Sequence, residues 1–95
     1  MIIGYSVLYV NDYITVKDAL WSKRVVYSTW ESALNHAVSR AEQEKNQYDD
    51  SYIISLVSSK SKTTCESYGT AQVCTIQMKG YGEIGSIHIV PVYGE

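Results

Sequence analysis

The sequence lacks a long apolar run, a surplus of charge and any motif that carries a reaction. No apolar run approaches the ~20 residues that a membrane-spanning helix needs. The formal net charge is only −2, which excludes a polybasic nucleic-acid arm and a strongly acidic DNA-mimicking surface. Hydrophobic residues make up 45% of the 95 positions, so we expect one globular domain, 1–95, rather than a disordered chain.

The aromatic residues are unevenly distributed among the three types. The chain has no Phe, two Trp and nine Tyr. Tyr combines a large apolar ring with a polar tip, which suits half-exposed sheet faces and protein interfaces. Tyr also has a high strand propensity, so the same residues could simply fill a sheet. The composition therefore indicates a sheet-rich domain and is compatible with an interaction surface.

One amphipathic helix is the clearest element of the sequence. Ser28 to Glu31 reads as a capping box, with Ser28 as the N-cap and Glu31 at the third helical position. Apolar residues then recur at helical spacing and fall on one stripe, which predicts a helix over about 29–47. The members of that stripe are Trp30, Ala33, Leu34, Ala37, Val38 and Ala41.

Runs rich in Val, Ile and Tyr predict about five strands around this helix. Turn signals and the single proline, Pro91, bound them, and the polar segment 58–64 reads as an exposed loop or the end of a protruding hairpin. The resulting order ββαβββ predicts an α+β two-layer sandwich, with the helix packed on a mainly antiparallel sheet. The strands are expected at about 3–10, 19–27, 51–58, 70–79 and 83–93.

A single helix cannot cover both faces of a five-stranded sheet. Several strands carry apolar residues on both faces, as Leu8 and Val10 do against Val7 and Tyr9, whereas a solvated face would alternate more cleanly. We therefore expect a protein partner, or a homodimer formed through the open sheet face.

The redox state of the two cysteines bears on which cellular compartment the protein occupies. In a hairpin centred on Gly69 and Thr70, Cys65 and Cys74 would lie opposite each other, and a disulfide between them would be geometrically allowed. In a reducing cytosol both would remain thiols. The N-terminal stretch has no basic segment before it and reads as a strand rather than a signal peptide, so we expect a cytoplasmic protein, in the host cytoplasm if it is viral. Two cysteines with no nearby histidine do not make a zinc set, and no metal or cofactor is expected.

No residue pattern indicates catalysis. His36 is expected on the solvated face of the helix, and His88 on the open sheet face beside Thr75 or Gln77. A general-base role for His88 would need a partner that the sequence does not identify. A small ribonuclease-type toxin is the best enzyme reading, and a sequence pI of about 5.6 fits it poorly because such an enzyme must hold RNA. Direct nucleic-acid binding is disfavoured for the same reason.

The sequence therefore favours a non-catalytic protein-binding module, such as a small phage or mobile-element inhibitor that blocks a host defence or regulatory protein. An alternative is a homodimer that sequesters a nucleotide-like molecule, with Lys60 and Lys62 holding its phosphate. The expected partner-binding residues lie in predicted loops or at strand ends, where binding residues concentrate. They are Tyr13, Trp21, Lys23, Arg24, Lys60, Lys62, Tyr68 and Tyr81.

Overall fold

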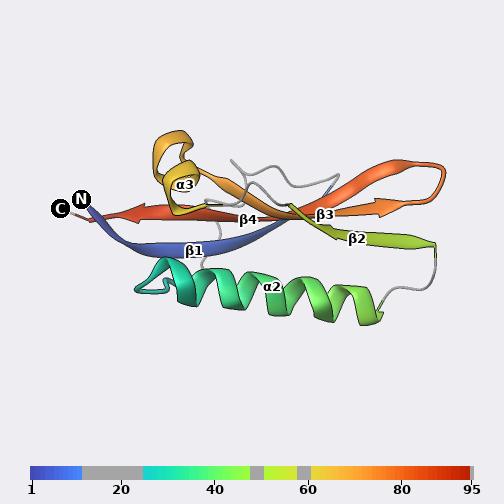
Figure 1. Ribbon diagram of the computed structural model, residues 1–95, viewed down its shortest axis with the longest axis horizontal. Coiled ribbons are helices and arrows are strands. Elements are labelled where there is room, and N and C mark those ends of the chain that lie inside the picture. Colours follow the sequence, from blue (N-terminus) through green and yellow to red (C-terminus); the bar gives the residue numbers. More distant parts are fainter. Residues whose placement is uncertain (12–24, 48–50, 58–60, 95) are drawn as a thin grey trace.

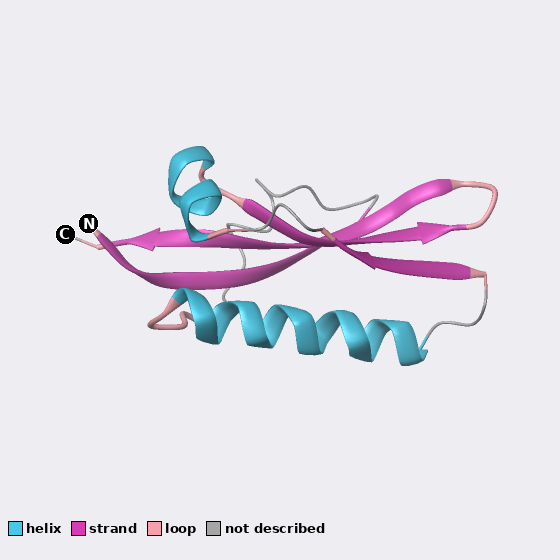
Figure 2. Cartoon of the chain, in the orientation of Figure 1, coloured by secondary structure: helices cyan, strands magenta, loops and turns pink. Residues whose placement is uncertain are grey.

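The computed structural model describes residues 1–11, 25–47, 51–57 and 61–94 (Figure 1). In this part of the chain two helices accompany one antiparallel sheet, whose four strands lie in the order β1-β4-β3-β2. Figure 2 shows α2 running along one side of the sheet. The α+β class is therefore confirmed. The elements are β1 (Ile2–Asn11), α2 (Trp30–Gln47), β2 (Tyr52–Leu56), α3 (Lys62–Tyr68), β3 (Ala71–Met78) and β4 (Gly82–Tyr93).

The predicted strand at 19–27 is not present where the structure describes it. Residues 19–24 lie outside the described residues, and the rest of that segment forms a single bridge instead of a strand. Two backbone hydrogen bonds of 2.7 Å join Tyr5 and Tyr27. The β-branched Val25 and Val26 favoured a strand, yet both are exposed and make no ladder in the described part.

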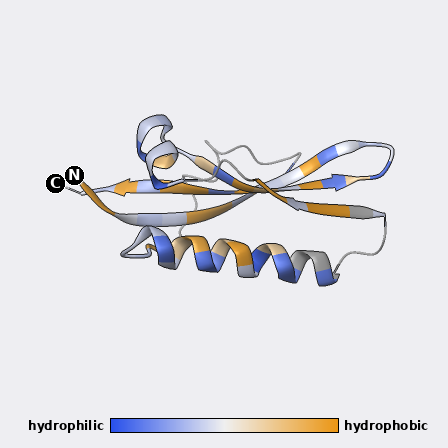
Figure 3. Ribbon diagram, viewed as in Figure 1, coloured by the Kyte–Doolittle hydropathy of each residue, from blue (hydrophilic) through white to orange (hydrophobic). Residues whose placement is uncertain are grey.

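Helix α2 confirms the amphipathic stripe but begins one residue later than predicted. Its N-cap is Thr29 rather than Ser28, because Thr29 Oγ1 accepts a hydrogen bond from the Ser32 backbone N–H at 3.1 Å. Ala33, Ala37 and Ala41 are at most 2% exposed, so their small side chains let the helix backbone lie close to the sheet. Figure 3 shows hydrophobic and hydrophilic residues alternating along α2.

Helix α3 begins at Lys62, within the segment 58–64 that was predicted as an exposed loop or the end of a protruding hairpin, and residues 58–60 of that segment lie outside the described residues. Ser61 is its N-cap and accepts a hydrogen bond from the Thr64 backbone N–H at 3.0 Å. Gly69 ends the helix in the left-handed region, at φ 79°, and donates its backbone N–H to the Cys65 carbonyl at 2.9 Å. The loop prediction for 62–64 was wrong because a helix of only seven residues is too short to show a periodic apolar pattern, and its two caps are the only local signals.

The expected hairpin between the cysteines is therefore absent. Cys65 lies on α3 and Cys74 on β3, and both are fully buried thiols. The Cys65 thiol donates to the Ile89 carbonyl at 3.4 Å. Burial, followed by the charge of Glu66, raises the pKa of Cys65 to about 11. Cys65 is thus a protonated core residue at neutral pH.

The face of the sheet that α2 covers contains the main core. Antiparallel pairing places Val7 opposite Ile89 and Tyr9 opposite Ile87, so these four side chains share one face. Tyr5 lies on the same face and meets the Trp30 ring edge to face, with 5.8 Å between the ring centroids. Residues of both helices belong to this single cluster, including Trp30 and Cys65.

The opposite face is apolar over only half of its width. Leu8, Val10 and Val90 form a second cluster there and are between 2% and 8% exposed. Thr75 and Gln77 of β3 give the other half a polar character. The half over β1 and β4 is therefore buried within the single chain, which leaves only the β2–β3 half for the predicted pairing of two copies across this face.

Candidate functional site

The structure describes three of the eight partner-binding residues predicted from the sequence. Five of the eight, namely Tyr13, Trp21, Lys23, Arg24 and Lys60, lie outside the described residues. Lys62 and Tyr68 are exposed on α3, and Tyr81 is exposed in the turn between β3 and β4. Figure 1 places α3 toward one end of the molecule and that turn at the other end. The structure therefore separates Tyr81 from the other two.

Lys62 borders a cavity of about 320 Å³ at the start of α2. The carboxylates of Glu31 and Glu66 line the same cavity, so its charge is not suited to a phosphate. The Tyr5 hydroxyl donates a hydrogen bond to a carboxylate oxygen of Glu66 at 2.7 Å. Burial of the ring, together with this carboxylate, raises the pKa of Tyr5 to about 12. Nothing in this cavity favours the nucleotide-binding alternative.

His88 belongs to a row of hydroxyl contacts on the face opposite α2. Ser86 Oγ lies 2.7 Å from His88 Nε2, and Thr70 Oγ1 lies 3.3 Å from His88 Nδ1. His88 lies on the sheet face opposite α2, as predicted, but it is half-buried rather than exposed, and its cross-strand neighbours are Leu8 and Gln72 rather than Thr75 or Gln77. Burial lowers the pKa of His88 below its ordinary value, and the charge of Glu83 opposes this shift.

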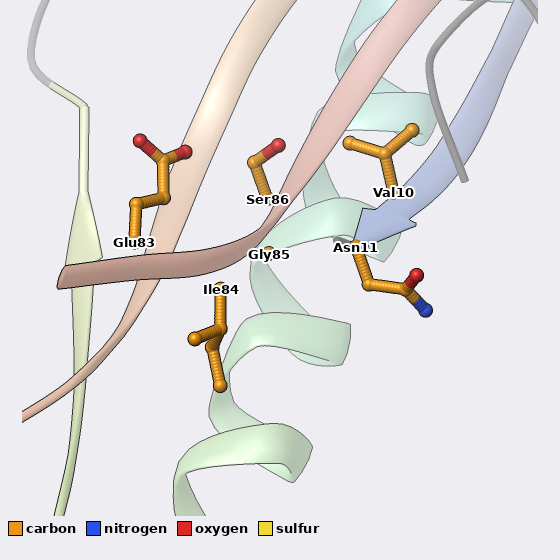
Figure 4. A pocket seen from close by; sticks show the side chains of 6 residues that line it. All are labelled: Val10, Asn11, Glu83, Ile84, Gly85 and Ser86. Atoms are coloured by element: carbon orange, nitrogen blue, oxygen red, sulfur yellow. The ribbon is translucent and has the colours of Figure 1, made fainter. Parts of the chain in front are cut away.

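A cavity of about 220 Å³ adjoins this row (Figure 4). The side chains of Ser86, Glu83 and Val10 point to one side of the sheet there, and those of Ile84 and Asn11 point to the other. A serine hydroxyl beside a neutral imidazole is the start of a nucleophilic site. The second ring nitrogen, however, meets the Thr70 hydroxyl rather than a carboxylate. The arrangement is that of a satisfied structural hydrogen-bond chain.

Strand β2 forms one edge of the sheet and β1 forms the other. Neither strand contains a charged residue or a proline, the two features that commonly protect a sheet edge, but the outer side of β1 is bridged to Tyr27 by two backbone hydrogen bonds. Ile53 is 43% exposed and Leu56 is 55% exposed, on opposite faces of the strand. Among the described residues, β2 pairs with β3 alone.

The hydrogen bonds at the two ends of β2 show which of its backbone groups point outward. The Val57 N–H donates to the Val73 carbonyl at 2.8 Å, and the Lys79 N–H donates to the Ser51 carbonyl at 2.9 Å. Because such pairs alternate along an antiparallel ladder, odd-numbered residues of β2 bond to β3. The N–H and C=O groups of the even-numbered residues, 52, 54 and 56, therefore point away from the sheet.

A groove between α2 and β2 runs beside these outward-pointing groups. Ala41 and Glu42 of α2 and Ile54 and Leu56 of β2 line a cavity of about 310 Å³. The methyl group of Ala41 leaves room for a large apolar side chain, and the Glu42 carboxylate lies at the border. We refer to Tyr52–Leu56 together with this groove as the β2 edge.

Sequence reasoning did not identify the β2 edge as a binding site. It predicted a strand at 51–58 but could not order the strands, and edge position depends on that order. The available signal was a short uncharged run, Tyr-Ile-Ile-Ser-Leu, between two polar segments.

In the described part of the chain, no group of three or more His, Cys, Asp or Glu residues is placed to hold a metal ion. No helix in that part is long and apolar enough to cross a membrane. Comparison with protein-family models gave no match, and comparisons with curated proteins and with solved structures gave none either.

Proposed function

We propose that this protein is a non-catalytic protein-binding module, and that it binds an extended segment of its partner as an added strand at the β2 edge. The outward N–H and C=O groups of residues 52, 54 and 56 are the observation that supports this most directly. A ligand that satisfies them must present a backbone in the extended conformation. A polypeptide does so, whereas a nucleic acid or a small molecule does not.

The groove adds a side-chain requirement to the backbone requirement. An added strand would place alternate side chains on the α2 face, where the cavity of about 310 Å³ accepts a large apolar residue. Glu42 at the border favours a basic residue next to that anchor. The preferred partner segment is therefore extended, apolar at its centre and neutral or basic.

The biological role that fits such a module is occlusion of a surface on another protein. We retain the context of a small phage or mobile-element inhibitor that blocks a host defence or regulatory protein. Strand addition supports that context because a short module can cap a sheet edge of an unrelated protein without any sequence-specific chemistry of its own.

Proline at position 56 tests the proposal. The probe is a displayed library of random peptides of about ten residues, selected on the wild-type protein. Leu56→Pro removes an N–H that points outward and leaves the bonds to β3 intact, so the fold should persist. We expect the selected peptides to bind Leu56→Pro and Leu56→Lys about tenfold more weakly, or worse, by titration calorimetry.

Two controls make the result specific. Tyr93→Ala removes an exposed ring at the end of β4, where the strand pairs with Ile2 of β1, and should leave peptide affinity unchanged. Ser55→Pro removes an N–H that faces β3 and should lower the melting temperature, which Leu56→Pro should not do. Peptides that bind all folded variants equally, or a library that yields no binder, would overturn the assignment of the β2 edge.

A further inference from the structure

We infer that, when no partner is bound, the β2 edge pairs with β2 of a second copy of this chain. This inference rests on the proposed site and concerns its regulation, because a second copy and a partner segment would compete for the same backbone groups. The register of the strand, its lack of charge and its length carry the argument.

The register makes β2 complementary to itself. The outward-pointing groups belong to residues 52, 54 and 56, which are placed symmetrically about the central residue, Ile54. An antiparallel pair with its two-fold axis between the two Ile54 residues sets Ile54 against Ile54 and residue 52 against Leu56 of the second copy. Every outward N–H and C=O of both strands then has a partner, as a two-fold interface requires.

The composition of the strand favours this register. No charged residue lies within Tyr52–Leu56, so pairing two copies brings no like charges together along the strands. Leu56 is 55% exposed in the single chain and would lie beside the second copy on the α2 face. Pairing therefore covers apolar surface that is otherwise in water.

The short length of β2 limits the strength of this dimer. Stable interfaces bury roughly 1,200–2,000 Å² in total, and a contact made by five residues of each chain falls below that range. The pairing should therefore be weak and reversible. Such a dimer protects an uncharged edge from uncontrolled association and still gives way to a partner that also fills the groove.

Sedimentation equilibrium and a pair of cysteine variants test the inference on the full chain. The average mass should rise from that of one 10.7 kDa chain toward that of two as concentration increases from about 10 µM to about 1 mM. Under mild oxidation, Ile54→Cys should form a disulfide-linked dimer, because facing Cα atoms in a hydrogen-bonded pair lie about 5.5 Å apart.

Ile53→Cys is the matched control. In the proposed register residue 53 faces Ser55 of the second copy, so the Cα atoms of the two residues at position 53 would be about 8 Å apart, too distant for a disulfide. A mass of one chain at every concentration, or equal cross-linking of both variants, would overturn the inference. If the protein stays a single chain while selected peptides still depend on Leu56, the dimer fails and the proposed function stands. If peptide binding fails as well, both fall.

Discussion

At the scale of single residues, His88 is a group whose surroundings clearly change its chemistry. It is held between Ser86 and Thr70, and burial disfavours its charged form. Its lowered pKa means that the imidazole is neutral in the folded protein at neutral pH. One ring nitrogen then donates and the other accepts, which a row of hydroxyl groups can satisfy in either direction.

This shift predicts how stability depends on pH. The pKa of His88 is lower in the folded state than in the unfolded state, so the unfolded chain binds the extra proton first as pH falls. The stability that the neutral histidine contributes is present above its ordinary pKa, near 6.5, and is lost as pH falls below it. Urea unfolding at pH 7.5 and at pH 5 measures the loss.

His88→Gln is the comparison variant, because an amide can also donate and accept but does not titrate. Carboxylates such as Glu83, and the exposed His36, remain in both proteins, so the difference between the two pH profiles isolates His88. We expect the wild-type protein to lose more stability between the two pH values than the variant does. Parallel profiles would show that the imidazole does not titrate across this range.

At the scale of elements, the helices show what local sequence signals could and could not predict. Helix α2 has a long apolar stripe, and its start was predicted within one residue. Helix α3 has one buried residue, Cys65, in seven, so no periodic pattern is visible. Its caps at Ser61 and Gly69 were the only signal, and a Ser/Thr-rich segment reads equally well as a loop.

The strands show a different limit. Their apolar runs placed β1, β3 and β4 close to the observed positions, because strand propensity is read locally. The order β1-β4-β3-β2 is not local, and it alone makes β2 an edge. The candidate site could therefore not be found from sequence, even though the strand that carries it was predicted.

The caps of α3 predict the effect of two substitutions. Ser61→Ala removes the acceptor for the Thr64 N–H and should lower the free energy of unfolding by about 1 kcal/mol. Gly69→Ala meets no atom within 4 Å but forces a side chain into positive φ, which should cost about 1–2 kcal/mol. Denaturant unfolding measures both. Ser67→Ala, an exposed change within the same helix, should cost nothing; an equal loss there would contradict the capping explanation.

At the scale of the whole molecule, the sheet uses its two faces differently. One face packs against α2 along all four strands. The same face contacts α3, because Cys65 of α3 belongs to the main core and Tyr5 of β1 donates a hydrogen bond to Glu66 of α3. The other face holds the cluster of Leu8, Val10 and Val90 and becomes polar toward β3. Leu8 and Val10 of β1 and Val90 of β4 are thus buried in the chain's own core, whereas Ile53 and Leu56 of β2 are exposed.

This division predicts that equivalent truncations on the same face will have different consequences. Leu8 is 4% exposed, so Leu8→Ala should lower the free energy of unfolding by about 2–5 kcal/mol through lost burial and the cavity it leaves. Ile53 is 43% exposed, and Ile53→Ala should cost about 1 kcal/mol or less. Urea unfolding measures both. Folded Leu8→Ala should bind selected peptides as the wild-type protein does, because the second cluster does not include β2. If Leu8→Ala instead left stability unchanged and weakened peptide binding, the interaction surface would lie over β1 and β4 rather than at the β2 edge.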